Sequence, residues 1–301
     1  MYVKKIFFII FLFFELVFSQ EKSIITVLGT VQDGGLPHIG CNKHGCDQPP
    51  SPDFKVTSLG LTLPNNEGFY LFEASPDFSY QLRLMSSLYS SPFNGVFITH
   101  AHIGHYTGLM FLGKEALDAK NIIVYVMKRM SDFLRNNGPW SQLVDDSNIK
   151  LVQLSNNESI RISKNLSVRP VLVPHRDEFS ETVGYFIQGQ NKTAFFLPDI
   201  DKWKNWSMSL KEVVKKTDIL FLDATFYDNS EINYRSIESI PHPFVIETIE
   251  SLKSLPIEEK KKIYFIHMNH TNPMLNPESH ISNSILKQGY NIAKIGQTFQ
   301  L

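Results

Sequence analysis

Three histidines lie within six positions of one another in the segment FITHAHIGHYTG. His100 and His102 follow a short apolar run, and His105 follows Gly104. Residues at i and i+2 of an extended chain point to the same side, so the first two imidazoles can reach one ion. Gly104 lets the backbone turn sharply and places His105 at the mouth of a following helix. Because neutral imidazole is the commonest metal ligand, the pattern favours a metal site over three exposed loop histidines.

Three further apolar runs end on a residue that can bind a metal. They stop at VPHRDE, LPDID and FIHMNH, which supply His175, Asp199 and His267. Open α/β sheets build their sites at the C-terminal ends of strands. A single histidine such as His175 is more often structural than a ligand, and a single aspartate such as Asp199 often forms a turn. Because three apolar runs end on such a residue, we predict that these side chains converge. Such a set suits zinc, as one or two ions, and iron is the alternative.

Other polar residues have weaker claims. Asp33 in TVQDGG and His38 belong to a Gly-rich turn that can approach the site, but we favour a plain turn. Asp223 ends a strand in LFLDATFYD and competes with the aspartate of LPDID as metal carboxylate, and His242 in IPHPF is either a pocket residue or a loop histidine. Three acidic residues follow the histidine of VPHRDE and are expected to fix its tautomer: Asp177, Glu178 and Glu181.

The two cysteines of the chain lie close together in GCNKHGC, with a histidine between them. In an exported chain, Cys41 and Cys46 can form a disulfide. With His44 and ligands from elsewhere they can instead hold a second, structural metal. The sequence leaves both interpretations open.

The N-terminal segment MYVKKIFFIIFLFFELVFSQ is typical of an export signal. Two lysines precede an apolar run over residues 6–18, and Val-Phe-Ser gives a small-residue cleavage pattern. The run is short for a membrane span and is broken by Glu15. We therefore predict a signal peptide over residues 1–19 and a periplasmic or secreted protein without stable membrane insertion. An uncleaved membrane anchor is the less favoured alternative.

Composition and organisation exclude several classes. The 301 residues are 43% hydrophobic and 20% charged, which is ordinary for a globular protein, and the net charge of −1 predicts no nucleic-acid partner. There is no Gly-x-Gly-x-x-Gly or P-loop motif to indicate a nucleotide cofactor. Without a repeat or linker, residues 20–301 are expected to form a single domain. The expected partner is a small-molecule substrate.

Short apolar runs alternate with helical stretches along the whole chain. Strands are expected at 23–28, 59–63, 69–72, 95–99, 122–126, 166–173, 182–187, 193–197, 219–222, 262–266 and 292–295. Helices are expected at 77–88, 106–117, 128–136, 209–215, 244–252 and 278–287. This many strands, with helices throughout, predicts an α/β (α+β) protein with two helix-covered sheets and not a single Rossmann sheet.

These motifs together resemble the metallo-β-lactamase superfamily. Its motif is His-x-His-x-Asp-His after a strand, followed by a lone His, a lone Asp and a last His at strand ends. The match extends over nearly all of residues 20–301 and implies an αββα sandwich of two mixed sheets flanked by helices. Within the superfamily, LGTVQDGGLPHIGC, VPHRDEFSETVG and FIHMNHTNP are most similar to pyrroloquinoline quinone biosynthesis protein B and its exported relatives.

The resemblance also implies how the ligands divide between two metal sites. The first site would take His100, His102 and His175, and the second would take His105, Asp199 and His267. Asp199 would bridge the sites and act catalytically by holding the attacking water or its proton.

One position departs from the family motif. Gly104 replaces the family's Asp, so the second site lacks its usual carboxylate. His270, three residues beyond the last family histidine, is the nearest replacement and a second catalytic candidate. The alternative is a loop histidine that orders the turn before Pro273.

The function expected from this resemblance is hydrolysis. A zinc-like ion lowers the pKa of bound water from 15.7 towards about 7 and polarises a carbonyl or phosphoryl oxygen. We expect an exported hydrolase that uses a metal-bound hydroxide on a small ester, lactone, amide or phosphodiester. Two alternatives stay open: an iron-dependent oxidation, which the quinone-biosynthesis resemblance suggests, and a non-catalytic metal-binding protein.

Overall fold

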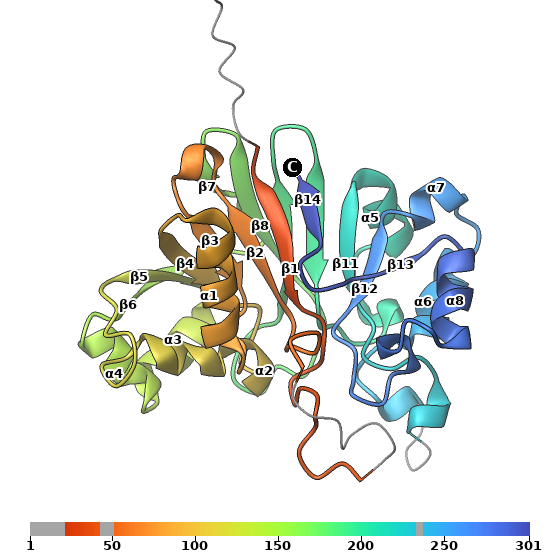
Figure 1. Ribbon diagram of the computed structural model, residues 1–301, viewed down its shortest axis with the longest axis horizontal. Coiled ribbons are helices and arrows are strands. Elements are labelled where there is room, and N and C mark those ends of the chain that lie inside the picture. Colours follow the sequence, from red (N-terminus) through yellow and green to blue (C-terminus); the bar gives the residue numbers. More distant parts are fainter. Residues whose placement is uncertain (1–21, 43–50, 233–236) are drawn as a thin grey trace, which may run out of the picture.

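Two mixed β-sheets pack face to face, and helices cover their outer faces (Figure 1). The computed structural model describes residues 22–42, 51–232 and 237–301. Each sheet has seven strands, and each combines a parallel half with an antiparallel half. The predicted αββα metallo-β-lactamase sandwich is therefore confirmed.

The first sheet has the strand order β14-β1-β2-β3-β4-β5-β6. Its strands are β1 (Ile24–Gly29), β2 (Ser58–Thr62), β3 (Phe69–Phe72), β4 (Phe93–Phe97), β5 (Ile122–Val126), β6 (Ile149–Gln153) and β14 (Thr298–Gln300). The pairs from β3 to β6 are parallel, and the others are antiparallel.

The second sheet has the order β13-β12-β11-β10-β9-β8-β7. Its strands are β7 (Ile160–Ser163), β8 (Leu166–Leu172), β9 (Val183–Gln188), β10 (Thr193–Leu197), β11 (Ile219–Asp223), β12 (Ile263–Ile266) and β13 (Asn291–Ile292). The pairs from β10 to β13 are parallel, and the others are antiparallel.

Helices flank both sheets. Those beside the first sheet are α1 (Phe78–Tyr89), α2 (Ile103–Tyr106), α3 (Lys128–Asn136) and α4 (Trp140–Asp145), and those beside the second are α5 (Leu210–Lys216), α6 (Val245–Leu252), α7 (Ile257–Lys260) and α8 (His280–Lys287). Short 3-10 helices are η1 (Pro64–Asn66), η2 (Thr107–Leu112), η3 (Trp203–Asn205), η4 (Asn229–Glu231), η5 (Ile237–Ser239) and η6 (Pro273–Leu275). None of the helices in the described part of the chain has the length and apolar character of a membrane span.

Aromatic side chains fill the space between the sheets. Phe97 stacks on Tyr125 with ring centroids 4.3 Å apart, and Phe72 meets Phe196 of the opposite sheet edge-on. Burying one such ring stabilises the fold by about 1.5–3 kcal/mol. The strand ends that carry the ligand-type residues therefore project from a closely packed, rigid base.

The expected strands are all present, but three short ones were not predicted. The missed strands β6, β7 and β14 each form one edge of a sheet and are largely half-exposed or exposed. Edge strands bury fewer side chains and so have a weaker apolar pattern. Helices α4 and α7 were missed as well, and both are short.

The helix predicted at 106–117 is wrong in form. The segment is a one-turn α2 that contains His105, followed by the 3-10 helix η2. Gly108 lies against the chain after β3 so closely that a Cβ there would be 2.2 Å from the carbonyl oxygen of Ser75. A residue with a side chain could not approach Ser75 so closely. The segment therefore forms two short helices and not one regular helix.

The predicted signal peptide at 1–19 lies outside the described residues. Cleavage and export therefore stay predictions. His44 and Cys46 also lie outside them, so the choice between a disulfide and a structural metal at Cys41, His44 and Cys46 stays open.

Candidate metal centre

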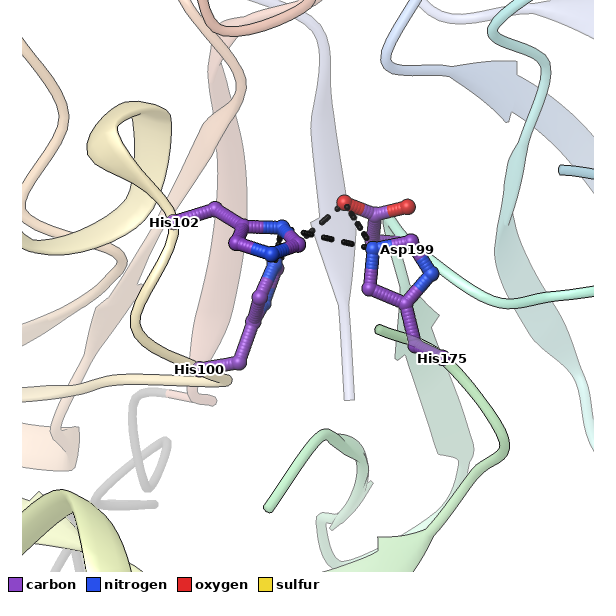
Figure 2. Close-up of side chains that lie close together, drawn as sticks. All are labelled: His100, His102, His175 and Asp199. Atoms are coloured by element: carbon purple, nitrogen blue, oxygen red, sulfur yellow. Dashed lines mark hydrogen bonds and ion pairs between the residues drawn. The ribbon is translucent and has the colours of Figure 1, made fainter. Parts of the chain in front are cut away.

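The predicted ligands meet at one edge of the paired sheets. His100 and His102 follow β4 of the first sheet, whereas His175, Asp199 and His267 follow strands β8, β10 and β12 of the second. In Figure 2, the imidazoles of His100, His102 and His175 point towards one another and towards the Asp199 carboxylate. The sequence prediction that these strand ends converge is borne out by the geometry.

The first ligand set has the spacing of a tetrahedral metal site. Asp199 Oδ2 lies 3.3 Å from both His100 Nε2 and His175 Nε2, and His102 Nδ1 lies 3.3 Å from His175 Nε2. His102 Nδ1 and His100 Nε2 are 2.8 Å apart. Ligand atoms 2.0–2.1 Å from a tetrahedral zinc are about 3.3–3.4 Å from one another. The four atoms can therefore hold one ion with only small shifts.

A second ligand set lies directly beside the first. His105 Nε2 is 3.1 Å from Asp33 Oδ1, and His267 Nε2 is 3.4 Å from the same oxygen. His105 Nε2 is also 3.6 Å from Asp199 Oδ2, the oxygen of the first set. Asp199 therefore lies within reach of His105 of the second set, and its bridging of two ions stays a prediction.

The chemistry of these donors fits a metal ion. Burial lowers the pKa of His100 and of His102, which keeps both in the neutral form that binds metals. His105 Nε2 is buried and makes no hydrogen bond with any described residue, although it lies against carboxylate oxygens. Buried polar atoms normally find a partner, and a cation held between these donors would provide it.

Comparison with known proteins identifies the family. A family model described as a beta-lactamase superfamily domain matches residues 69–268. The chain belongs to the beta-lactamase superfamily. Among curated proteins, coenzyme PQQ synthesis protein B of Nitrosococcus oceani is 25% identical over 85% of this chain and 93% of its own length. The protein of that name from Methylobacterium sp. (strain 4-46) is 23% identical over 91% of this chain and 99% of its own length.

Solved structures show the same fold. The zinc-bound PqqB from Methylobacterium extorquens has a TM-score of 0.74 at 22% identity, covering 92% of this chain and 100% of its own. A diphosphatase from the PhnP family has a TM-score of 0.66 at 22% identity, covering 93% of this chain and 98% of its own. The chain thus has the metallo-β-lactamase fold and is similar to PqqB, as its motifs predicted.

Asp33 is the main correction to the sequence-based site. We favoured a plain turn over one that approaches the site, but its carboxylate lies between His105 and His267. His270, expected as the replacement ligand, is in none of the ligand clusters of the described chain; its ring stacks on that of His38 at 3.9 Å. His38, a weaker candidate, therefore supports His270 from the same loop as Asp33 and does not reach the ligands.

A chain of hydrogen bonds orients the histidines on the first sheet. The Nδ1 atom of His100 lies 2.9 Å from Thr99 Oγ1, and this hydroxyl donates to Glu73 Oε1. Glu73 also accepts from His105 Nδ1 at 3.1 Å. A proton on each Nδ1 leaves the Nε2 lone pairs free for a metal in this superfamily site. Burial opposes the charged form of His105, but the charges of Glu73 and Asp33 raise its pKa.

Glu73 was missed in the sequence, although a signal for it exists. It is fully buried and comes directly after the apolar strand β3, as Asp199 comes soon after β10. Its φ of 77° lies in the left-handed region that few non-glycine residues adopt. Such backbone strain often marks a functional position.

The second sheet has a matching arrangement at His267. Its Nδ1 lies 3.0 Å from Thr225 Oγ1, and this hydroxyl donates to Asp223 Oδ1 at 2.7 Å. Asp223 Oδ2 accepts from the backbone of Ile200. Because both oxygens of Asp223 are already in use, its geometry supports Asp199 as the metal carboxylate of the first set.

His242 lies between the two carboxylates and is a pocket residue. Its Nδ1 is 3.0 Å from Asp199 Oδ1 and 2.9 Å from Asp223 Oδ2. Burial alone would lower its pKa, but the charges of Asp199 and Asp223 raise the pKa of His242 to about 10. The two carboxylates thus favour the protonated imidazole, which lies in reach of Asp199.

The three acidic residues that follow His175 have different roles from the one expected. Glu178 Oε2 lies 3.1 Å from His102 Nε2 and so fixes the tautomer of His102 and not that of His175. Asp177 accepts from Thr182, and Glu181 accepts from the backbone of α3.

Proposed function

We propose that this PqqB-like protein is an exported metal-dependent hydrolase. The observation that carries the proposal is the pair of adjacent ligand sets, in which Asp199 Oδ2 of the first lies 3.6 Å from His105 Nε2 of the second. A zinc-like ion bound there would supply Lewis acidity and would lower the pKa of a water molecule to about 7. Export rests on the N-terminal sequence pattern, and N-terminal sequencing of the secreted or periplasmic protein tests it.

The residues of this chain supply the remaining functions. Asp199 would fix the orientation of the attacking water or take its proton, because this buried carboxylate lies against histidines of both ligand sets. His242 keeps a proton on Nδ1 between Asp199 and Asp223 and balances their charge. A cationic donor of this kind favours the development of negative charge on the leaving group.

Exposed side chains beside the ligands favour an anionic substrate with an apolar part. Arg176 follows His175 in the chain and brings a guanidinium nitrogen within 3.5 Å of His102 Nε2. Ile103 and Phe179 follow shortly after ligand-bearing residues and are 61% and 60% exposed. Within the expected substrate classes, we therefore favour a phosphodiester, whose negative charge an arginine can bind.

The His102→Ala substitution tests this function. We expect loss of metal from the first ligand set and loss of hydrolysis of phosphodiester, ester and lactone probes such as bis-p-nitrophenyl phosphate. The exposed His280 at the start of α8 gives a matched control, and His280→Ala should keep both properties. Full activity in His102→Ala would contradict the proposal.

A second candidate function is a metal-dependent oxidation. It is favoured by the curated relatives, which are named coenzyme PQQ synthesis protein B. A His-rich set with a carboxylate also suits iron. The protein purified without added metal should contain zinc if the hydrolase proposal holds. One iron per chain, with oxygen uptake and no hydrolysis, would support the oxidation instead, and bound metal without either activity would support a binding role.

A further inference from the structure

We infer that Asp33 is the carboxylate ligand of the second metal ion, supplied by the loop between β1 and β2 in place of the side chain absent at Gly104. The inference rests on the proposed metal-dependent function and deepens it. It accounts for the departure of this chain from the family motif, because the missing ligand would come from a segment 71 positions earlier in the sequence.

The carboxylate of Asp33 takes the same space that a side chain at position 104 would take. A Cβ built on Gly104 would lie 2.0 Å from Asp33 Oδ1 and 2.6 Å from its Cγ. These distances are far below van der Waals contact, so Asp33 and an aspartate at 104 exclude each other. The glycine is therefore the counterpart of Asp33 and not a sign of a degraded site.

The position of the Asp33 oxygen is that of a ligand. Oδ1 lies 3.1 Å from His105 Nε2 and 3.4 Å from His267 Nε2, close to the ligand spacing of about 3.3–3.4 Å around zinc. The second set then has two imidazoles and one carboxylate oxygen, and Asp199 Oδ2 lies 3.6 Å from His105 Nε2. The missing negative charge of the family motif is restored.

The loop that carries Asp33 is tied to the segment that carries His267. The Gln32 amide donates to the Met268 carbonyl at 2.8 Å, and the Asn269 side chain donates to Gln32 Oε1 at 2.7 Å. The Met268 amide in turn donates to the Thr30 carbonyl. The residues just before Asp33 and just after His267 are thus paired by hydrogen bonds, which holds the two side chains in register before any ion binds.

The tight turn after Asp33 also suits this placement. Gly35 has a φ of +68°, and its amide donates to the Gln32 carbonyl at 2.8 Å. A residue with a side chain would be strained at this φ, whereas glycine is not. The turn directs the Asp33 side chain inwards, where it is 21% exposed.

The test compares zinc stoichiometry and affinity in two variants with those of the full-length natural protein. Asp33→Asn keeps the shape of the side chain but removes its charge. After removal of metal with a chelator, titration with zinc should give two equivalents for the natural protein. Removing an outer partner of a metal ligand typically weakens metal binding 10–100-fold. Loss of a ligand itself should cost more, so in Asp33→Asn we expect the second zinc equivalent to bind at least about 100-fold more weakly. The first equivalent should be retained.

The double variant Asp33→Gly with Gly104→Asp guards against a merely structural effect of losing Asp33. It moves the carboxylate back to the family position. A Cβ at 104 would still lie 2.7 Å from the Cα of residue 33, so the backbone of this loop must shift slightly, and we then expect the double variant to recover the second zinc equivalent. Gly104→Asp alone should not gain affinity, because the new side chain collides with Asp33. The exposed Asp53→Asn serves as the matched control in the same loop and should behave like the natural protein.

Each outcome decides the inference. Two tightly bound zinc ions in Asp33→Asn would overturn the role of Asp33 while leaving the hydrolase proposal intact. A natural protein that binds only one zinc would also overturn it. If the natural protein binds no metal, the proposed function fails as well. Loss of the second ion in Asp33→Asn with recovery in the double variant would establish Asp33 as its ligand.

Discussion

Single buried carboxylates set the orientation of the histidine ligands. Glu73 illustrates this, because it accepts hydrogen bonds from both Thr99 and His105 and is fully buried. Glu73→Gln replaces one carboxylate oxygen by an NH2 group, which can donate but not accept a hydrogen bond. The Nδ1–H of His105 then has no assured acceptor. We expect zinc affinity to fall about 10–100-fold, as is typical for such outer partners. Competition titration against a chelator measures this; the exposed Glu67→Gln is the control, and unchanged affinity in Glu73→Gln would contradict the assigned role.

Glu231 predicts a pH dependence of stability that is independent of the metal ligands. Burial raises the pKa of Glu231 from 4.5 to about 7, although the carboxylate accepts from Tyr227 and Thr271. The folded state therefore binds this proton more tightly than the unfolded state. The stability that protonation of Glu231 contributes is fully present below about pH 4.5 and is lost as the pH rises through about 7.

The Glu231→Gln variant isolates this effect, because its amide is neutral at every pH. At 1.36 kcal/mol per pKa unit, the variant should gain stability relative to the natural protein by on the order of 3 kcal/mol between pH 4.5 and pH 8. Urea unfolding at both pH values measures the difference. The exposed Glu158→Gln should show no such change, and a constant difference for Glu231→Gln would refute the raised pKa.

At the scale of elements, the α2–η2 segment must pack closely against the end of β3. The amide of Ala74 donates to the His105 carbonyl, and the amide of Gly108 donates to the Ala74 carbonyl, both at 2.8 Å. A Cβ at Gly108 would lie 2.2 Å from the Ser75 carbonyl oxygen. The position of His105 relative to Glu73 therefore depends on a glycine at 108.

The Gly108→Ala substitution should accordingly push α2 away from β3. We expect a loss of about 1–3 kcal/mol in the free energy of unfolding, as is typical of overpacking. The second zinc equivalent should also bind more weakly, because His105 moves with the segment. Denaturant unfolding and zinc titration measure the two effects. Gly138→Ala, where a Cβ meets no atom within 4 Å, is the control, and equal behaviour of the two variants would contradict the packing argument.

The same elements show what a sequence can and cannot predict about this site. His100, His175 and Asp199 were predictable because each follows a run of apolar residues, and strand ends are local features of the sequence. Asp33 was not, because it reaches the ligands only through the pairing of its loop with Met268, more than 230 positions away. His270 is close to His267 in sequence, but the turn between them directs its ring to His38.

At the scale of the whole molecule, the metal centre joins the two sheets. His100, His102 and His105 follow β4 of the first sheet, and the remaining ligands after β8, β10 and β12 belong to the second, apart from the loop residue Asp33. An ion that binds only when both sheets are in place stabilises the folded state by mass action. At a free zinc concentration 100 times the Kd, this amounts to about 2.7 kcal/mol per ion.

Removal of the metal should therefore lower the thermal stability of the entire sandwich and not only that of the site. We expect a chelator to lower Tm by several degrees, and zinc to restore it with a Tm that rises with zinc concentration, each tenfold excess adding about 1.4 kcal/mol. Scanning calorimetry measures both. His102→Ala should lose the part of this response that comes from the first set, since one of its ligands is gone, whereas His280→Ala should keep all of it. An identical Tm with and without chelator would mean that the ligands do not tie the two sheets together through an ion.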